Sequence, residues 1–346
     1  MPFAMPLGDD FRRRPPQQVR VVVFGATGYI GRFVVQELVT RGYEVIAFSR
    51  ERSGIGGRDG REQVISDLAG AEVRFGDVTD PTSIAANAFD QPVDVVVSCL
   101  ASRNGGRRDS WAIDHDATLN TFREGKRAGA SHFVLLSAIC VQKPLLEFQK
   151  AKLAFEAILQ QDGNMTYSIV RPTAFFKSLA GQVESCRKGG PYVMFGNGEL
   201  ASCKPISEAD LARFMADCLS DEDKLNRILP IGGPGAALSA RQQADLLFQA
   251  LNRKPRLLSV PIALMDGPIA LLNWLSRLFP GLQDTAEFGR IGRYYASESM
   301  LVWDAAQKRY DADATPSYGN DTLEQFFQRV ARDGMKGQEL GDAALF

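Results

Sequence analysis

The sequence has few cysteines and histidines, the residues that build disulfide frameworks and zinc sites. It contains five cysteines and two histidines among 346 residues. No two cysteines form a Cys-x-x-Cys pair, their number is odd, and no second histidine lies at ligand spacing from His115. A disulfide framework or a zinc site is therefore not expected. We predict a protein of a reducing compartment with no bound metal ion.

A strong charge of one sign and a long uninterrupted apolar run are also missing. The formal net charge is -1, which provides no general field for nucleic acid. The apolar stretch Pro261 to Phe279 contains Asp266 and Arg277, whereas a membrane-spanning helix needs about 20 predominantly apolar residues. No transmembrane segment is expected. We predict that this stretch packs in the core, while a lid over a flat apolar substrate and a membrane-surface contact stay open as alternatives.

The first 18 residues lack the apolar core of a signal peptide. They contain two aspartates, the run Arg12 to Arg14 and the pair Pro15-Pro16, and are too short and too acidic for an organelle transit sequence. We interpret residues 1–18 as a disordered leader whose basic run could touch an anionic membrane.

The stretch from Val21 to Gly31, Val-Val-Val-Phe-Gly-Ala-Thr-Gly-Tyr-Ile-Gly, predicts a dinucleotide site. Its apolar start has the composition of a buried parallel strand, and helical periodicity follows from Tyr29 to Thr40. Glycines in such a turn allow a positive φ, close approach of a phosphate and tight helix packing, and the free N–H groups of the helix attract a pyrophosphate. A tight turn that binds nothing is the alternative. The residues expected to contact the cofactor here are Gly25, Thr27, Gly28, Tyr29, Ile30 and Gly31.

The end of the second predicted strand, Glu44 to Arg50, indicates which dinucleotide binds. An acidic residue at this point would bind the 2′-hydroxyl of the adenosine ribose and repel a 2′-phosphate. Here the strand ends in Ser49 and Arg50, and a guanidinium fits a phosphate bidentately. We therefore predict NADPH, in contact with Ser49 and Arg50. A solvated arginine at a strand end is the alternative.

Further strands place more residues at the same edge of the expected sheet. Asp77 and Val78 follow the third strand, Glu72 to Phe75, and are expected to contact adenine. The fourth strand, Asp94 to Leu100, is uniformly apolar, as a strand buried on both faces should be. The residues at its carboxyl end that are expected beside the cofactor's ribose and nicotinamide are Cys99, Leu100 and Ala101.

The order of these strands predicts the fold class. Strands that begin near residues 20, 44, 72, 94 and 132 alternate with helical segments, which predicts an α/β fold with a doubly wound parallel sheet of the Rossmann type. We place an NADP-binding domain at residues 19–173. Residues 174–346, where the alternation lapses, are expected to form a smaller, mainly substrate-binding lobe with segments returning to the core.

The later strands carry the first family resemblance. With the glycine turn, Ser137 after the fifth strand, Lys152 in the next helix and Arg171-Pro172-Thr173 after the sixth resemble the extended and atypical short-chain dehydrogenase/reductases. That resemblance implies that Lys152 and Ser137 are catalytic, and that Lys152, Arg171, Pro172 and Thr173 contact the cofactor. In that superfamily a tyrosine precedes the lysine by four positions, whereas Phe148 stands here. Ordinary alcohol–carbonyl chemistry is therefore not expected.

A closer resemblance is to the NADPH-dependent 3,8-divinyl (proto)chlorophyllide a 8-vinyl reductases. It runs from about Val21 to Leu340. The segments that carry it are Gly54 to Gly57, Phe75 to Asp80, Val97 to Ser102, Asp109 to Trp111, Leu136 to Leu146, Arg171 to Lys177, Gly190 to Phe195, Leu229 to Pro234 and Ile291 to Tyr295.

This resemblance implies an oxidoreductase acting on a CH–CH group. The family reduces the 8-vinyl group of divinyl chlorophyllide a, or of divinyl protochlorophyllide, to ethyl in chlorophyll or bacteriochlorophyll biosynthesis, which serves photosynthesis. Because plant members carry a transit peptide and none is recognised here, a phototrophic bacterium and a cytoplasmic location are expected, with a membrane-peripheral position left open. The partner is then a tetrapyrrole, and the oligomeric state is not predicted.

The reaction of this family agrees with the loss of the tyrosine. Hydride addition to the vinyl terminus leaves negative charge spread over the macrocycle, which needs less immediate protonation than a localised alkoxide. Lys152 is expected to hold the nicotinamide ribose and to place positive charge near the reacting centre, and a solvated helix lysine is the alternative. The candidates for the proton donor are Tyr294, Tyr295, His115, Lys143 and bound water. Ser137 either positions the substrate or closes the strand end.

Two other functions stay open on the sequence alone. Phe148 in place of the tyrosine is also consistent with a redox sensor that binds NADP without turnover. Reduction of another conjugated alkene, such as a phenylpropanoid, is the other alternative.

Overall fold

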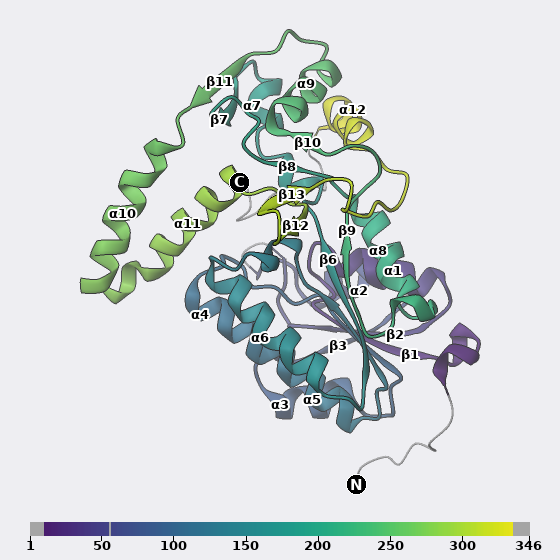
Figure 1. Cartoon of the computed structure of the whole chain (residues 1–346). Coiled ribbons are helices and arrows are strands. Elements are labelled where there is room, and N and C mark those ends of the chain that lie inside the picture. Colours follow the sequence, from purple (N-terminus) through teal and green to yellow (C-terminus); the bar gives the residue numbers. More distant parts are fainter. Residues whose placement is uncertain (1–9, 55–56, 335–346) are drawn as a thin grey trace.

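The protein is built around a seven-stranded parallel sheet (Figure 1), seen in a computed structural model that describes residues 10–54 and 57–334. The strand order is β3-β2-β1-β4-β5-β6-β9. Because the chain winds outward from β1 in both directions, a crevice forms where β1 and β4 end, at the point where doubly wound sheets bind ligands. The strands are β1 (Arg20–Phe24), β2 (Glu44–Ser49), β3 (Glu72–Phe75), β4 (Val95–Ser98), β5 (His132–Leu136), β6 (Thr166–Pro172) and β9 (Arg227–Ile231). The predicted Rossmann-type fold is confirmed.

Helices cover both faces of this sheet, which explains why its central strands are apolar throughout. Successive side chains of a strand point to opposite faces, so Val21 and Val23 belong to one core cluster, and Val22 and Phe24 to the other. The helices over the first cluster are α1 (Gly31–Thr40), α2 (Arg61–Asp67) and α8 (Glu208–Asp217). Those over the second are α3 (Pro81–Ala88), α5 (Thr118–Arg127) and α6 (Glu147–Gln161).

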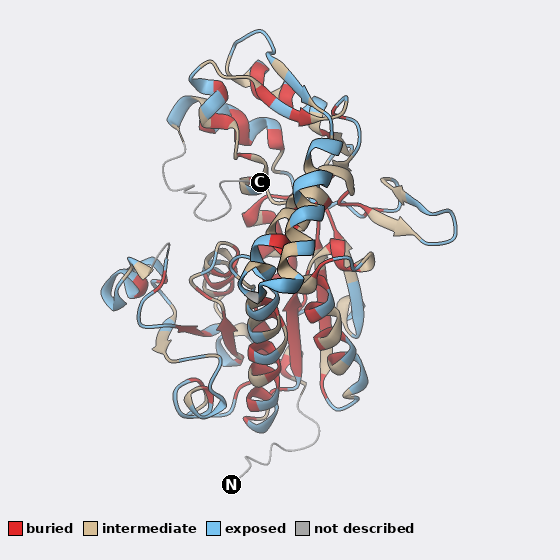
Figure 2. Cartoon of the chain, turned by 90° about the vertical axis from the view of Figure 1, so that its left-hand side faces the viewer, coloured by how far each residue is buried: buried red, intermediate tan, exposed pale blue. Residues whose placement is uncertain are grey.

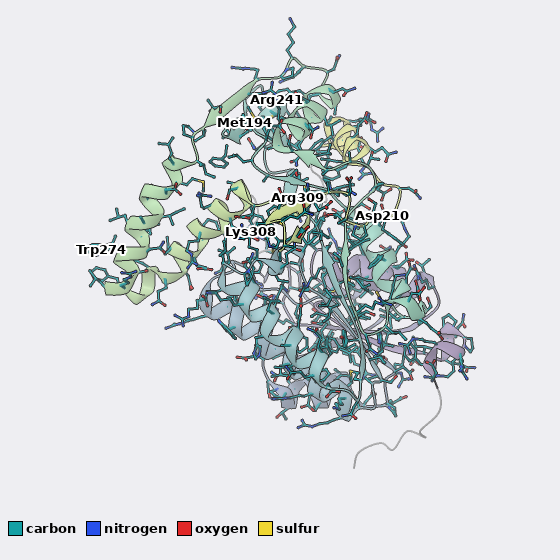
Figure 3. All side chains as sticks on the ribbon, in the orientation of Figure 1. Met194, Asp210, Arg241, Trp274, Lys308 and Arg309 are labelled. Carbon is teal, nitrogen blue, oxygen red and sulfur yellow. The ribbon has the colours of Figure 1, made fainter. Side chains whose placement is uncertain are left out.

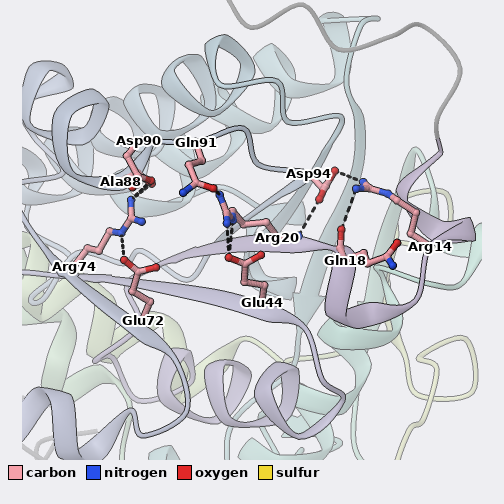
Figure 4. Close-up of polar contacts among 10 residues, drawn as sticks. All are labelled: Arg14, Gln18, Arg20, Glu44, Glu72, Arg74, Ala88, Asp90, Gln91 and Asp94. Carbon is pink, nitrogen blue, oxygen red and sulfur yellow. Dashed lines mark hydrogen bonds and ion pairs between the residues drawn. The ribbon is translucent and has the colours of Figure 1, made fainter.

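The described part of the predicted leader packs against the sheet. Phe11 is buried, with its ring centroid 6.2 Å from that of His132. Arg14 forms an ion pair with Asp94, whose other carboxylate oxygen accepts a hydrogen bond of 2.8 Å from the backbone N–H of Arg20 (Figure 4). The prediction of a disordered leader is therefore wrong for residues 10–18, because an aromatic side chain and an arginine anchor them. Residues 1–9 lie outside the described residues.

The carboxyl-terminal part adds a second core above the sheet (Figure 1). Its elements are α7 (Val183–Arg187), β7 (Tyr192–Phe195), β8 (Ser202–Cys203), β10 (Leu238–Ser239), α9 (Ala240–Ala250), β11 (Leu257–Val260), β12 (Val302–Asp304), β13 (Arg309–Asp311) and α12 (Leu323–Asp333). Phe175, which follows β6, forms a β-bridge with Ile206. The assignment of substrate binding to this part stays a prediction.

A helical hairpin of α10 (Ala263–Leu278) and α11 (Gln283–Ser297) projects from the side of the molecule (Figures 1 and 2). No residue of α10 is buried among the described ones. Trp274 points away from the sheet (Figure 3) and is 56% exposed. The predicted core packing of Pro261 to Phe279 is therefore wrong, because α10 packs against α11 on one side alone. Among the residues described, no helix is long and apolar enough to cross a membrane.

Candidate active site

The glycine turn has the geometry that a phosphate site needs. Gly25 has a φ of +75°, and a Cβ there would lie 2.7 Å from the carbonyl oxygen of Cys99. A Cβ on Gly31 would lie 2.0 Å from the carbonyl oxygen of Gly25, so α1 can begin tightly against the turn only with glycine there. Within the described residues, no side chain caps α1. The N–H groups of Arg32 and Phe33 donate to the carbonyls of Gly28 and Ile30, so an anion at this end would be attracted by the helix dipole and met by the N–H groups of the turn itself.

The other predicted residues of this turn lie at the same helix terminus. Thr27 and Ile30 belong to the turn between β1 and α1, and the main-chain N–H of Gly28 donates to the carbonyl of Gly25 at 2.9 Å. The hydroxyl of Tyr29 is buried and has no hydrogen-bond partner among the described residues. An unpaired buried hydroxyl costs free energy unless a ligand or water meets it, so this turn has an unused polar group.

Two arginines gather at the end of β2. Arg50 is exposed, and its guanidinium makes no hydrogen bond or ion pair with any described residue. Partial burial and the nearby Arg103 lower the pKa of Arg50, whereas Asp77 and Asp109 raise it. A bound phosphate would relieve the repulsion between the two guanidiniums. The main chain of Ser49 lies beside them, although its hydroxyl donates to the carbonyl of Arg50 at 3.0 Å.

Asp77 and Val78 also lie at this edge. Oδ1 of Asp77 accepts hydrogen bonds from the backbone N–H and the hydroxyl of Thr79, at 2.8 and 2.7 Å. Val78 is half-buried against the second core cluster. The structure therefore brings both to the side where adenine is expected, and their contacts with the cofactor stay predictions.

Lys152 is held by a buried ion pair that the sequence did not predict. Its Nζ lies 2.9 Å from Oδ1 of Asp114, and the two residues are 8% and 2% exposed. Asp114 lies on a π-helix, Ser110–Ala117, and the wider turn of that helix aims the carboxylate at α6. The other oxygen of Asp114 has no hydrogen-bond partner among the described residues.

Residues after β4 complete this side of the crevice. Burial raises the pKa of the Cys99 thiol to about 12, while the positive charge of Lys152 lowers it. Cys99 is therefore a neutral, buried residue next to the lysine. Leu100 packs partly in the second core cluster, and Ala101 is exposed. The predicted residues Cys99, Leu100 and Ala101 thus lie between the glycine turn and Lys152.

Ser137 and Arg171 belong to a second buried network. The hydroxyl of Ser137 donates to Glu156, and Arg171 forms an ion pair with the same carboxylate. Glu156 is fully buried, so the network fixes the ends of β5 and β6 relative to α6. Pro172 ends β6, and the hydroxyl of Thr173 donates to the carbonyl of Lys204. Direct contact of these four predicted residues with cofactor or substrate stays a prediction.

An apolar wall faces the end of β5. Phe148, at the position where the superfamily carries tyrosine, packs with Ala138, Ile291 and Met300 in one cluster. The ring thus lies among apolar side chains from the loop after β5, from α11 and from the segment that follows α11. A groove of about 580 Å³ lies elsewhere, at the amino ends of β5 and β6, where its lining includes Arg12 and Thr166. Doubly wound sheets bind ligands at the opposite edge, so this groove is not part of the site.

Sequence reasoning missed Asp114, Glu156 and Arg103. Each meets its partner only through the fold: Asp114 is 38 positions before Lys152, and Arg103 is 53 positions after Arg50. The run Asp114-His-Asp116 was a visible cluster of polar residues. Nothing in its spacing predicts a π-helix, so the partner of Lys152 could not be read from it.

Comparisons with known proteins agree with this geometry. The NAD(P)H-binding family matches residues 25–222. The chain is 57% identical over 350 residues to the chloroplastic divinyl chlorophyllide a 8-vinyl-reductase of Oryza sativa subsp. indica, covering all of this chain and 86% of that protein. The Arabidopsis thaliana protein of the same name is 58% identical, covering 96% of this chain and 81% of its own. An NADPH-dependent quinone oxidoreductase from Escherichia coli, solved with NADPH, has a TM-score of 0.61 at 16% identity, covering 90% of this chain and 99% of its own.

These relatives correct one expectation. Proteins that are 57–58% identical to this chain are named as chloroplastic enzymes of plants. The predicted location in a bacterial cytoplasm is therefore wrong. It depended on interpreting residues 1–18 as lacking a transit sequence, and the composition of so short a segment does not determine a location.

Proposed function

Since the chain belongs to the divinyl chlorophyllide a 8-vinyl-reductase family, we infer that it uses NADPH to reduce the 8-vinyl group of divinyl chlorophyllide a to an ethyl group. The observation that carries this inference is 57–58% identity over at least 96% of the chain. Divinyl protochlorophyllide has the same vinyl group and is the second substrate to test. The redox-sensor and phenylpropanoid alternatives are not favoured, because relatives this similar carry the name of a reductase.

The crevice fits a phosphorylated dinucleotide at three points. The uncapped start of α1 suits the pyrophosphate, and the pair Arg50 and Arg103 suits the 2′-phosphate. Lys152, held by Asp114, has two ammonium protons left for the hydroxyls of the nicotinamide ribose. When bound, NADPH supplies the hydride. The residues of the chain fix its position and surround the reacting alkene.

The apolar wall suits reduction of an alkene on a macrocycle. Phe148 has no hydroxyl, and its ring contacts carbon side chains, so it offers neither a proton nor a charge. A flat apolar macrocycle buries surface against such a wall at about 25 cal/mol per Å². The delocalised negative charge that follows hydride addition is stabilised by the ammonium of Lys152, which lies on the same side of the fold. Ser137, bonded to Glu156, is proposed to keep the end of β5 in place.

The direct test uses the purified chain with NADPH and divinyl chlorophyllide a. Reduction of the 8-vinyl group shortens the conjugated system, so we expect a blue-shifted absorption band and consumption of one NADPH per product. NADH at the same concentration is the matched control and should react more slowly. A mixture that binds NADPH but forms no monovinyl product would exclude the reductase function.

We also propose that the hairpin touches a lipid surface. The exposed residues on one face of α10 are apolar and recur at helical spacing: Leu264, Leu271, Trp274 and Leu278. Exposed basic residues, Arg253, Lys254 and Arg256, precede the hairpin in the chain and suit anionic headgroups. This face of α10 is apolar and uncharged, and the proposed substrate is an apolar pigment. Contact of this face with a bilayer surface is therefore more favourable than its exposure to water.

A further inference from the structure

The two helical segments that carry the ion pair of Lys152 and Asp114 both begin without a side-chain cap. The π-helix of Asp114 continues from the short helix α4 (Arg107–Asp109), which begins after Gly106. Helix α6, which carries Lys152, begins after Leu146. Glycine and leucine have no side-chain oxygen, so neither residue can accept a hydrogen bond from the free N–H groups at a helix start. An acceptor for these groups has to come from water or from elsewhere in the fold.

Helix α11 supplies such an acceptor to both segments. Oδ1 of Asp284 accepts a hydrogen bond of 3.0 Å from the backbone N–H of Arg107. Oε1 of Glu287 accepts one of 2.7 Å from the backbone N–H of Glu147, the first residue of α6. The two acidic residues are three positions apart, so they lie on one face of α11. A carboxylate at a helix N-terminus also interacts favourably with the helix dipole, so each acid stabilises the helix start that it contacts.

The contacts of Asp284 and Glu287 are closely fitted. A Cβ on Gly106 would lie 2.8 Å from Cγ of Asp284, so a larger residue there would displace this carboxylate. Glu287 is 4% exposed, and its second carboxylate oxygen pairs with Arg290 at 3.0 Å. Arg290 in turn donates to the carbonyl of Leu145 at 2.7 Å. An acid and a base from α11 therefore hold the main chain at the start of α6.

The starts of the two segments are also joined to each other. The indole N–H of Trp111, on the π-helix, donates to Oε2 of Glu147 at 3.2 Å. Trp111 lies three positions before Asp114. Glu147 lies five positions before Lys152. Since α11 contacts both starts, a shift of α11 would move α6 against the π-helix and change the distance between the ammonium and the carboxylate.

We propose that Asp284 and Glu287 are positioning residues for the reduction. By capping both segments from α11, they hold Asp114 and Lys152 at the separation at which the lysine can bind the nicotinamide ribose. They act through Lys152 and need no contact of their own with cofactor or substrate. The hairpin of α10 and α11 thereby belongs to the catalytic unit, although it projects from the side of the molecule (Figure 1). The proposal rests on the proposed function.

The first test compares Glu287→Ala with Glu287→Gln in the full chain. A misplacement of about 1 Å can cost about 100-fold in rate, so Glu287→Ala, which leaves the N–H of Glu147 without its acceptor, should lower kcat at least about tenfold. The dissociation constant for NADPH should change by at most about threefold, because the glycine turn is not displaced. Glu287→Gln keeps a carbonyl oxygen as acceptor and should restore kcat to within about threefold of the unchanged protein. A Glu287→Gln variant as slow as Glu287→Ala would overturn the proposal.

Asp266→Ala is the matched control. Asp266, on α10, pairs with Arg293 of α11 at 2.8 Å, so its loss weakens the hairpin without removing a helix cap. This variant should keep kcat within about twofold of the unchanged protein. Equal losses in Asp266→Ala and Glu287→Ala would contradict the proposal, because the effect would then belong to the hairpin as a whole.

Asp284→Ala is a second variant, at an exposed position, which tests the proposal even if Glu287→Ala does not fold. It should lower kcat at least about threefold, and Asp284→Asn, which keeps the acceptor oxygen, should restore it. Unchanged kcat in Asp284→Ala or in a folded Glu287→Ala would refute the positioning role.

Hydrogen exchange measures the caps without turnover. In Glu287→Ala the main-chain amides of residues 147–152 should exchange at least about threefold faster than in the unchanged protein, whereas Asp266→Ala should show no change. Equal exchange in all three proteins would exclude the proposed capping. If the unchanged protein does not reduce divinyl chlorophyllide a, the reductase function is refuted instead, and the exchange rates still decide whether α11 caps α6.

Discussion

Arg50 determines the choice of cofactor in this proposal because it stands where NAD enzymes carry an acid. Arg50→Ala should weaken NADPH by about 1–3 kcal/mol, the contribution of a charged hydrogen bond, and leave NADH almost unchanged. Competition binding of the two nucleotides measures the difference. Arg52→Ala is the control, since the Arg52 side chain donates to the carbonyl of Gly57 instead. An Arg50→Ala protein that still prefers NADPH would remove Arg50 from the phosphate site.

The ion pair of Lys152 and Asp114 is expected to contribute both to turnover and to the stability of the fold. Removing one partner leaves a buried charge uncompensated, which costs about 3–5 kcal/mol. Lys152→Met and Asp114→Asn should each lower the free energy of unfolding by about that amount, and the double variant by less than their sum. Urea denaturation of the three proteins checks this.

Turnover of the same variants separates the two roles. Both proteins without Lys152 should lose turnover, whether or not stability is restored in the double variant. Asp116→Asn, a change at an exposed carboxylate on the same π-helix, is the control for folding. Near-normal turnover of Lys152→Met would exclude the lysine from the mechanism.

Among single residues, the sequence predicted some better than others. Gly25, Gly31 and Arg50 could be singled out because each follows a strand or begins a helix whose pattern was clear, and Lys152 because of the family resemblance; their roles at the site stay predictions. Asp114 was not, because its role depends on a π-helix. The hydroxyl of Ser137 is directed to Glu156, a contact that no local pattern encodes.

The turn between β1 and α1 is the element whose shape the site needs most. Gly31→Ala would place a methyl 2.0 Å from a carbonyl oxygen, so the start of α1 must shift. We expect NADPH binding to weaken more than tenfold and the free energy of unfolding to fall by about 1–3 kcal/mol. Gly267→Ala is the matched control, because a Cβ at this position of α10 meets no described atom within 4 Å. Equal NADPH affinity of the two variants would contradict this role of the turn.

A buried histidine makes the stability of the sheet sensitive to acid. His132 is buried at the start of β5, where burial and the charge of Arg12 lower its pKa to about 3. The unfolded chain binds a proton near the ordinary pKa of about 6.5, so the stability is complete above that pH and is lost as the pH falls toward 3. The contribution is at most about 1.4 kcal/mol per pH unit. His132→Gln should flatten the dependence of unfolding free energy on pH between 6.5 and 4.5, and an unchanged slope would exclude His132 as its source.

Strands were predictable as elements, whereas packing partners were not. β1 to β6 were expected within a few residues because continuous apolar runs mark strands buried on both faces. α10 is also largely apolar, but it lies at the surface, since hydrophobicity alone does not say whether a helix has a second partner. The anchoring of residues 10–18 depends on Phe11 fitting beside His132, which lies 121 positions further along the chain.

The whole molecule combines a polar nucleotide crevice with an apolar hairpin, and the last prediction concerns how it meets its substrate. If α10 lies on a bilayer, burial of the Leu271 and Trp274 side chains contributes about 1.5–3 kcal/mol each to the free energy of binding. Replacing both with serine should lower binding to anionic vesicles at least about 100-fold in a flotation assay. Ile65→Ser, a change at an isolated exposed residue on α2, is the control and should float like the parent. NADPH binding should be equal in all three proteins, because the hairpin face is separate from the crevice. If the unchanged protein stays in solution in the presence of vesicles and sediments as a dimer, a second copy of the chain covers the apolar face of α10 instead.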